Sequence, residues 1–386
     1  MQSKLMRWGS AARAASVVTL LATAGCSLFQ PQPEPQPPPP PPKPQYAEPL
    51  ATHTFAFDPK TTRVVGELQV TFSHHEDTFA DIARRFNLGR DELVNANPGV
   101  DPWLPGEGTR IVLPTQFVLP DAEPEGVVVN LAALRLFYFP KPEKGQPRTV
   151  VTYPIGIGMV GWATPTGSTK IVSKRKDPVW TPPASVRKEH AADGDILPPT
   201  VPAGPDNPLG AFAMNLGWPT YLMHGTNKPA GVGMRASHGC IRLYPEDIAV
   251  LFQQIPIGTK VTVVNQPLVY QWQGDSLYVQ SYPPHEEHPE AKKAAKGQRF
   301  DKTVSNKMFQ VLKPHAATAD WALVEKVVND GRGVAVPVSR PGLTFDAYLA
   351  SARQVENRIP DGSNWDGTDN PVPVARSAQP VASAGQ

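Results

Sequence analysis

This sequence has little net charge and few cysteines, and the apolar run near its N-terminus is too short to span a membrane. Its 386 residues carry 37 basic and 35 acidic side chains, a formal net charge of +2. A dedicated nucleic-acid binder usually has a basic stripe, so we expect no nucleic-acid partner. The uncharged run over residues 14–25 is shorter than the about 20 residues that span a bilayer, although attachment to a membrane can be covalent. Cysteine occurs twice, as Cys26 and Cys240.

Proline, in contrast, is abundant, with 46 residues in the chain. Because proline removes a backbone donor and fixes φ, this content excludes a long-helix or coiled-coil protein and favours strands, turns and extended connections. The densest stretch, residues 31–44, predicts a polyproline II spacer about 43 Å long at ~3.1 Å per residue. After a lipid anchor, such a spacer would hold the folded part away from the membrane.

The N-terminus has the order of an export signal, in which basic residues precede an uncharged run. The run ends in Thr-Ala-Gly before Cys26, which resembles a bacterial lipobox. The resemblance implies that residues 1–26 are a lipoprotein signal peptide ending at a lipidated Cys26. Ser27 after it is similar to outer-membrane sorting in Gram-negative bacteria, so the expected location is the periplasm, with a lipid anchor in the outer membrane. An ordinary cleaved signal peptide is the alternative.

A Pro-rich linker over residues 27–62 leads to a compact βααβ pattern over residues 63–116. Thr78 is placed to cap the first helix, and Pro98 ends the second. The string Glu-Asp-Thr-Phe that ends at Phe79, together with the later Ala-Asn-Pro98, resembles a LysM domain. That family binds N-acetylglucosamine-containing glycans such as peptidoglycan, which implies glycan strands as a partner. The usual opening is Gly-Asp-Thr-Leu, and a packing module without a ligand stays open, since fold does not fix function.

Residues 125–266 show short strands separated by glycine and proline, with one clear helix that begins at Pro245. We therefore expect a mainly β protein, whose larger domain is a mixed β-sandwich or barrel-like fold preceded by the small βααβ domain. Residues 267–284 predict an appended hairpin that turns at Gly274. Residues 285–386 form a polar, partly disordered extension, with two short helices possible over residues 320–329 and 345–353.

A histidine and a cysteine that could form a nucleophilic pair stand sixteen residues apart, His224 and Cys240. Cysteine attacks as the thiolate, and a nearby imidazole makes that form accessible near neutral pH. Attack on a carbonyl requires backbone N–H groups that stabilise the oxyanion. Gly239 lets the chain turn tightly and expose consecutive amides. A lone thiol in an oxidising compartment is a candidate nucleophile, and a small buried side chain is the alternative.

The segment that begins at His224 and the sequence Ser-His-Gly-Cys that ends at Cys240 resemble the signature of the L,D-transpeptidases, the YkuD-type catalytic family. The resemblance covers roughly residues 125–265, and a LysM domain is a frequent companion. It implies that Cys240 is the nucleophile, that His224 is the general base and that the Gly225 carbonyl orients this histidine. It also implies an oxyanion hole made by the amides of His238, Gly239 and Cys240.

Three further residues are substrate-binding candidates: Arg242, Ser237 and Trp180. Arg242 replaces the Asn of some branches of the family, and a substrate carboxylate and a structural role are equally open for it. For Ser237 we favour organisation of the loop over chemistry. Trp180 and Trp162 flank proline-rich loops, either as walls of a peptide cleft or through plain packing.

The resemblance implies a peptidoglycan L,D-transpeptidase that needs no metal or organic cofactor. Cys240 would attack the carbonyl of the third residue of a tetrapeptide stem and expel D-alanine as a thioester forms. An amine would then resolve the thioester. That amine belongs either to another stem, which gives a 3–3 cross-link, or to a lysine of an outer-membrane lipoprotein. Water as the acceptor would make the enzyme an L,D-carboxypeptidase.

Two other interpretations use the same residues. The chain could be a non-catalytic peptidoglycan-binding lipoprotein, held by its lipid and its LysM domain, although the intact His-Gly-Cys segment argues against this. A zinc site could be formed by His224, His238 and Cys240, because these residue types ligate zinc. The set is one ligand short and has no nearby Glu, so we do not favour it.

Overall fold

The computed structural model describes residues 53–142, 144–283, 305–306, 308–310 and 318–359. Cys26, the expected signal peptide and the proline-rich spacer lie outside these residues, as does most of the C-terminal extension. No helix within the described ranges is long and apolar enough to cross a membrane.

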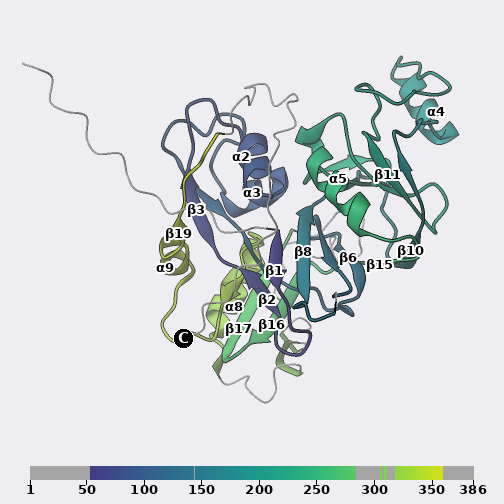
Figure 1. The fold of residues 1–386 in the computed structure, drawn as a ribbon. Helices are drawn as coiled ribbons and strands as arrows, with labels where there is room; N and C mark the ends of the chain where they lie inside the picture. The colour runs from purple at the N-terminus through teal and green to yellow at the C-terminus, as the bar shows by residue number, and fades with distance from the viewer. Residues whose placement is uncertain (1–52, 143, 284–304, 307, 311–317, 360–386) are drawn as a thin grey trace, which may run out of the picture. The chain divides into compact units, whose positions relative to one another are not determined.

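A curled nine-stranded sheet dominates the fold (Figure 1). In order across the sheet, its strands are β1 (Thr54–Ala56), β8 (Thr149–Pro154), β7 (Arg135–Phe139), β6 (Gly126–Asn130), β15 (Lys260–Val264), β10 (Gly167–Lys176), β11 (Phe212–Leu216), β12 (Leu222–His224) and β14 (Ile241–Arg242). Neighbouring strands are antiparallel except for the pairs β6–β15 and β12–β14. This architecture confirms the expected mainly β fold class.

The long strand β10 gives the sheet its curl, because it changes partner along its length. Residues 167–170 pair with β15, whereas residues 171–176 pair with β11 after an irregularity near Ile171. Such an irregularity bends a strand and increases its local twist. Alternate residues of these strands turn inward and form one apolar core together with Ile248 and Leu251 of helix α5 (Pro245–Gln254).

Helix α5 begins at Pro245 with Glu246 and Asp247 in its first turn, as the sequence predicts. A second helix, α4 (Ala184–Ala192), was not expected. Val186 is its one buried residue, so the sequence shows no apolar face that would have marked it. It belongs to an insertion between β10 and β11, closed at its base by the buried side chain of Asn207, whose amide donates to the carbonyls of residues 178, 201 and 202.

The N-terminal module, residues 64–118, has a βααβ core of β3 (Gln69–Phe72), α2 (Phe79–Arg85), α3 (Arg90–Ala96) and β4 (Arg110–Leu113). Strands β2 (Val64–Gly66) and β5 (Gln116–Val118) pair beside it. The Thr78 hydroxyl accepts from the Asp81 amide and the Asp81 carboxylate accepts from the Thr78 amide, which confirms the predicted helix cap. Phe79, Ile82 and Leu93 of this module share one core with Phe137 of β7.

The C-terminal part packs a hairpin, β16 (Leu268–Gln273) and β17 (Ser276–Ser281), against β18 (Val336–Pro337) and helix α8 (Trp321–Asp330). Helix α9 (Phe345–Ala350) follows. Both helices lie where the sequence predicts short helices. Their buried residues join Val70 and Val112 of the N-terminal module in a second core.

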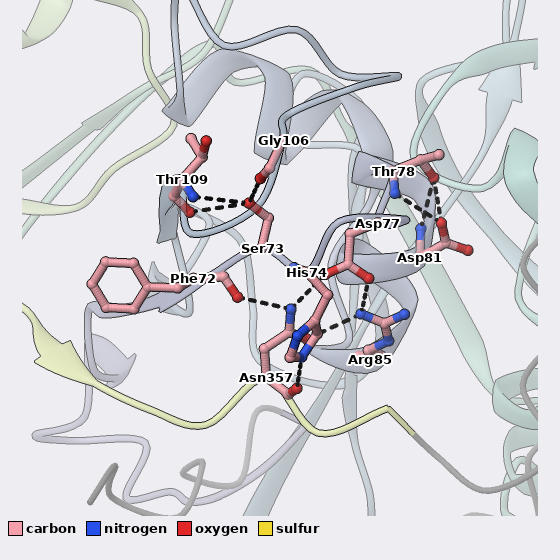
Figure 2. Close-up of polar contacts among 10 residues, drawn as sticks. All are labelled: Phe72, Ser73, His74, Asp77, Thr78, Asp81, Arg85, Gly106, Thr109 and Asn357. Atoms are coloured by element: carbon pink, nitrogen blue, oxygen red, sulfur yellow. Dashed lines mark hydrogen bonds and ion pairs between the residues drawn. The ribbon is translucent and has the colours of Figure 1, made fainter. Parts of the chain in front are cut away.

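Strand β19 (Arg353–Gln354) pairs in parallel with β3 and gives the module's sheet a third strand from the far end of the chain. Asn357 then fixes the β3–α2 loop (Figure 2). Its amide donates to the Phe72 carbonyl and to the Asp77 carboxylate, and its carbonyl side-chain oxygen accepts from Arg85. The main-chain oxygen of Asn357 lies 2.6 Å from Nε2 of His74.

Candidate active site

The two halves of the candidate site stand on adjacent strands. In the parallel pair β12–β14, His224 lies beside Arg242 and Met223 lies beside Ile241. Met223 and Ile241 point into the core, so His224 and Arg242 point to the opposite face, because side chains alternate along a strand. Cys240 precedes Arg242 by two positions and is half-buried at the same end. The fold therefore places the histidine at the end of one strand and the cysteine directly before its parallel neighbour.

His224 is buried and held in one tautomer. Its Nδ1 lies 2.6 Å from the carbonyl oxygen of Gly225, an acceptor, so Nδ1 carries the proton. Burial, and then the charge of Arg242, lowers the pKa of His224 to about 3. Hydrogen bonds to the Gly225 and Leu209 backbone oppose this shift only in part, so at neutral pH the imidazole is neutral and Nε2 carries no proton. The expectation that Gly225 orients this histidine agrees with the contact.

Cys240 is also neutral at rest. Burial raises the pKa of its thiol, and a hydrogen bond from the Leu222 backbone and the charge of Arg242 offset this only in part. The thiol donates to the Thr220 carbonyl at 3.7 Å. At rest Cys240 is thus a thiol and His224 a neutral imidazole. The physical reason is that burial disfavours the charged form of both groups.

Ser237 organises the loop that presents the cysteine. Its hydroxyl donates to the Cys240 carbonyl at 2.6 Å and accepts from the Gly239 amide at 3.2 Å. Gly239 has a φ of +101°, and a Cβ there would lie 2.8 Å from the ring of Tyr221. A glycine is therefore required at this turn. Because the Gly239 amide is used within the loop, the amides of His238 and Cys240 are the loop donors without a partner among the described residues.

Thr164 is a buried residue whose contact the sequence did not indicate. Its hydroxyl donates to the Gly239 carbonyl at 2.9 Å and accepts from the Gly158 amide at 3.0 Å. A Cβ on Gly158 would meet the Trp162 carbonyl at 1.8 Å, so this second glycine permits the same close packing. No spacing pattern in the sequence links Thr164 to residue 239.

His238 faces the insertion that carries α4. Its Nε2 lies 2.9 Å from the Glu189 carboxylate, and the Trp162 ring meets its imidazole edge to face at 4.8 Å between centroids. Nothing in the sequence indicated Glu189, because a single acidic residue in a polar helix carries no signal. Trp180 is half-buried at the base of the same insertion, where its backbone pairs with Val201.

Arg242 is the charged residue closest in register to His224. Its guanidinium is half-buried, and Nε has no hydrogen-bond partner among the described residues. A buried guanidinium nitrogen without a partner is costly unless a ligand or water satisfies it. Within the described ranges, no three His, Cys, Asp or Glu side chains gather as a metal site would require.

Comparison with known proteins places this arrangement in a family. Residues 124–263 match the model of the YkuD family, the L,D-transpeptidase catalytic domain. Over 227 residues the chain is 44% identical to the probable L,D-transpeptidase YcfS of Escherichia coli K12, covering 58% of this chain and 70% of that protein. Over 299 residues it is 37% identical to the probable L,D-transpeptidase ErfK/SrfK of Salmonella typhimurium, covering 75% and 93%.

Among solved structures, the catalytic domain of the Enterococcus faecium L,D-transpeptidase is 22% identical, with a TM-score of 0.27, and the match covers 38% of this chain and all of that one. The sequence matches decide the assignment. The chain belongs to the L,D-transpeptidase family, and it is an enzyme with a transpeptidase catalytic domain.

Proposed function

We propose that this enzyme acts on peptidoglycan stem peptides with Cys240 as the nucleophile and His224 as the general base. The observation that carries the proposal is the tautomer of His224. Since Nδ1–H is given to the Gly225 carbonyl, Nε2 is the ring nitrogen left to accept a proton. The proposal is also supported by the position of Cys240 directly before β14, the strand that pairs with His224 of β12.

The neutral pair defines the order of proton transfers. As Sγ of Cys240 attacks the carbonyl carbon of the third stem residue, the thiol proton passes to Nε2 of His224. Nε2 then gives this proton to the amine of the departing D-alanine, the C–N bond breaks and a thioester remains. An acceptor amine attacks the thioester and loses a proton to Nε2, and Cys240 leaves and regains that proton.

The oxyanion in this scheme is stabilised by backbone donors of the loop. The amides of His238 and Cys240 have no partner among the described residues and can serve it. Gly239 contributes its positive φ, which turns the loop, while its own amide is held by Ser237. Arg242 is proposed to bind the terminal carboxylate of the stem, because its charge lies beside the reacting pair and its Nε has no partner among the described residues.

The test is to incubate the chain without residues 1–26 with purified tetrapeptide muropeptides and to follow products by mass spectrometry. Loss of D-alanine with new dimers, both absent in Cys240→Ala and His224→Ala, is the expected result and establishes a 3–3 linkage. Loss of D-alanine without dimers would indicate an L,D-carboxypeptidase or a lipoprotein acceptor, which adding a lipoprotein substrate separates. No turnover by the wild type with any acceptor would favour a non-catalytic wall-binding protein.

The wall attachment is proposed from two features at the N-terminal side. The lipobox-like sequence before Cys26 supports a lipid anchor in the outer membrane, and the LysM-like string in the N-terminal module supports glycan binding. Trp103 and Leu104, 61% and 69% exposed, form an apolar tip after α3 on which a sugar ring could stack. Mass spectrometry of the mature N-terminus tests the anchor. Co-sedimentation of wild type and Trp103→Ala with insoluble peptidoglycan tests the glycan site.

A further inference from the structure

The N-terminal module contacts the segment that leads into strand β13 and the active-site loop at a point where two glycines meet. Gly89 at the α2–α3 turn and Gly233 in the segment before strand β13 (Arg235–Ser237) leave no room for a side chain. A Cβ on Gly233 would lie 2.1 Å from Cα of Gly89, and a Cβ on Gly89 would lie 2.5 Å from Cα of Gly233. Contacts this short require that something shift, so the two glycines set the separation of the two segments.

The segment that contains Gly233 also caps helix α3. The first amides of a helix have no partner within the helix. Here the Arg90 amide donates to the Val232 carbonyl at 3.4 Å and the Asp91 amide donates to the Gly233 carbonyl at 3.2 Å. The catalytic domain thus completes a helix of the module, and the module in turn fixes the segment that supplies the carbonyls.

Side chains around this contact hold it in place. Arg135 of β7, which is fully buried, makes a two-point ion pair with Glu92 of α3 at 2.8 and 2.9 Å. The buried Tyr244 hydroxyl donates to the Leu88 carbonyl at 3.1 Å. Two-point pairs and a buried hydrogen bond fix orientation as well as distance. Together with β19, which adds to the module's sheet, they make the module part of one packed unit rather than a domain on a flexible tether.

The fixed segment ends at the reacting loop. Strand β13 starts two residues after Gly233, pairs with β9 (Ile157–Gly158), and ends at Ser237, the residue whose hydroxyl holds the Cys240 carbonyl. A shift of the segment at Gly233 therefore reaches β13 within two residues, and β13 carries it to Ser237, which holds the Cys240 carbonyl.

We infer that the α2–α3 turn of the N-terminal module is a positioning element of the active site, which sets the place of Ser237 and Cys240 through the Gly89–Gly233 contact. This inference rests on the proposed role of Cys240. It gives the module a part in catalysis that does not involve glycan binding. Turnover of a substrate without any sugar should then depend on the module.

The experiment compares Gly89→Ala and Gly233→Ala with wild type in the mature full-length chain, using a free tetrapeptide that has no glycan and a saturating acceptor amine. Gly258→Ala is the matched control, because residue 258 also has a positive φ, +91° against +79° at residue 233, but its Cβ meets nothing within 4 Å. We expect kcat to fall by about 10²-fold in the two test variants, the loss that a misplacement of about 1 Å can cause. KM should change little, and Gly258→Ala should retain the wild-type kcat.

Amide hydrogen exchange supplies a readout that does not depend on turnover. Exchange at residues 232–239 should accelerate in both test variants and not in Gly258→Ala. If the test variants fold, as judged by circular dichroism, and keep wild-type kcat and exchange, the inference is wrong. If they fail to fold, Tyr244→Phe loosens the same contact by one hydrogen bond, and unchanged kcat and exchange there would overturn the inference. Absence of turnover in the wild type would instead refute the proposed function.

Discussion

Acidification should destabilise this protein through His224, because its imidazole is buried in the neutral form. The unfolded chain binds a proton at this residue near the ordinary pKa of 6.5, whereas the folded protein does so only near a pKa of about 3. Between these values the unfolded state holds more protons, so stability rises with pH and is lost as the pH falls. At about 1.4 kcal/mol per pKa unit, the full loss is roughly 5 kcal/mol.

Replacing His224 by Gln isolates this contribution, since Gln can still donate to the Gly225 carbonyl but does not titrate. The free energy of unfolding is measured by urea denaturation followed by tryptophan fluorescence. Between about pH 7 and about pH 4.5 it should fall by roughly 2.5 kcal/mol more in the wild type than in His224→Gln. Equal losses in the two proteins would refute the reasoning. So would an NMR titration of the folded protein in which the imidazole of His224 takes up its proton near pH 6.5.

Other contacts of the site and the module make separate predictions. Thr164→Val should lower the free energy of unfolding in urea by about 2 kcal/mol, because the Gly158 amide and the Gly239 carbonyl lose their shared partner. An unchanged urea midpoint would contradict this. Glu189→Ala should change the free energy of unfolding by less than about 1 kcal/mol, since its contact with His238 is partly exposed to solvent. It should accelerate hydrogen exchange across α4, and unaltered exchange would count against that contact. Asn357→Ala should lower the thermal midpoint by several degrees, as about 1–3 kcal/mol is lost when Asp77 loses a buried donor, and a calorimetric midpoint equal to that of wild type would rule this out.

Local signals in the sequence predicted the local structure. Three such signals act within a few residues: the short strand patterns between glycine and proline, the proline at the start of α5 and the Thr78 cap. The proline and the cap are observed where they were expected. Pairings between distant segments carried no such signal. The parallel pair β3–β19 joins residues that are 284 positions apart in the sequence. Arg353 and Gln354 are both polar, so no apolar pattern marks them as a strand.

The residues of the candidate site also differ in whether the sequence marks them. Spacing and resemblance predicted His224 and Cys240 as candidates, because a nucleophile and its base must be of particular residue types. Thr164 and Glu189 act through single hydrogen bonds that many other residues could make, so their identity gives no indication of their place. The neutral state of His224 and Cys240 also could not be predicted, since it depends on burial, which arises only when β12 and β14 lie side by side.

The pairing of β19 with β3 also has a consequence for the order in which the chain is made. Residues 69–72 leave the ribosome early, but the strand that covers their edge is synthesised almost three hundred residues later. Until then β3 presents an unpaired edge, which is a site where other extended chains can add. A nascent or truncated chain that stops before residue 353 therefore exposes an unpaired strand edge at residues 69–72, to which other chains can add. The edge of β3 is closed only when residues 353 and 354 have paired with it.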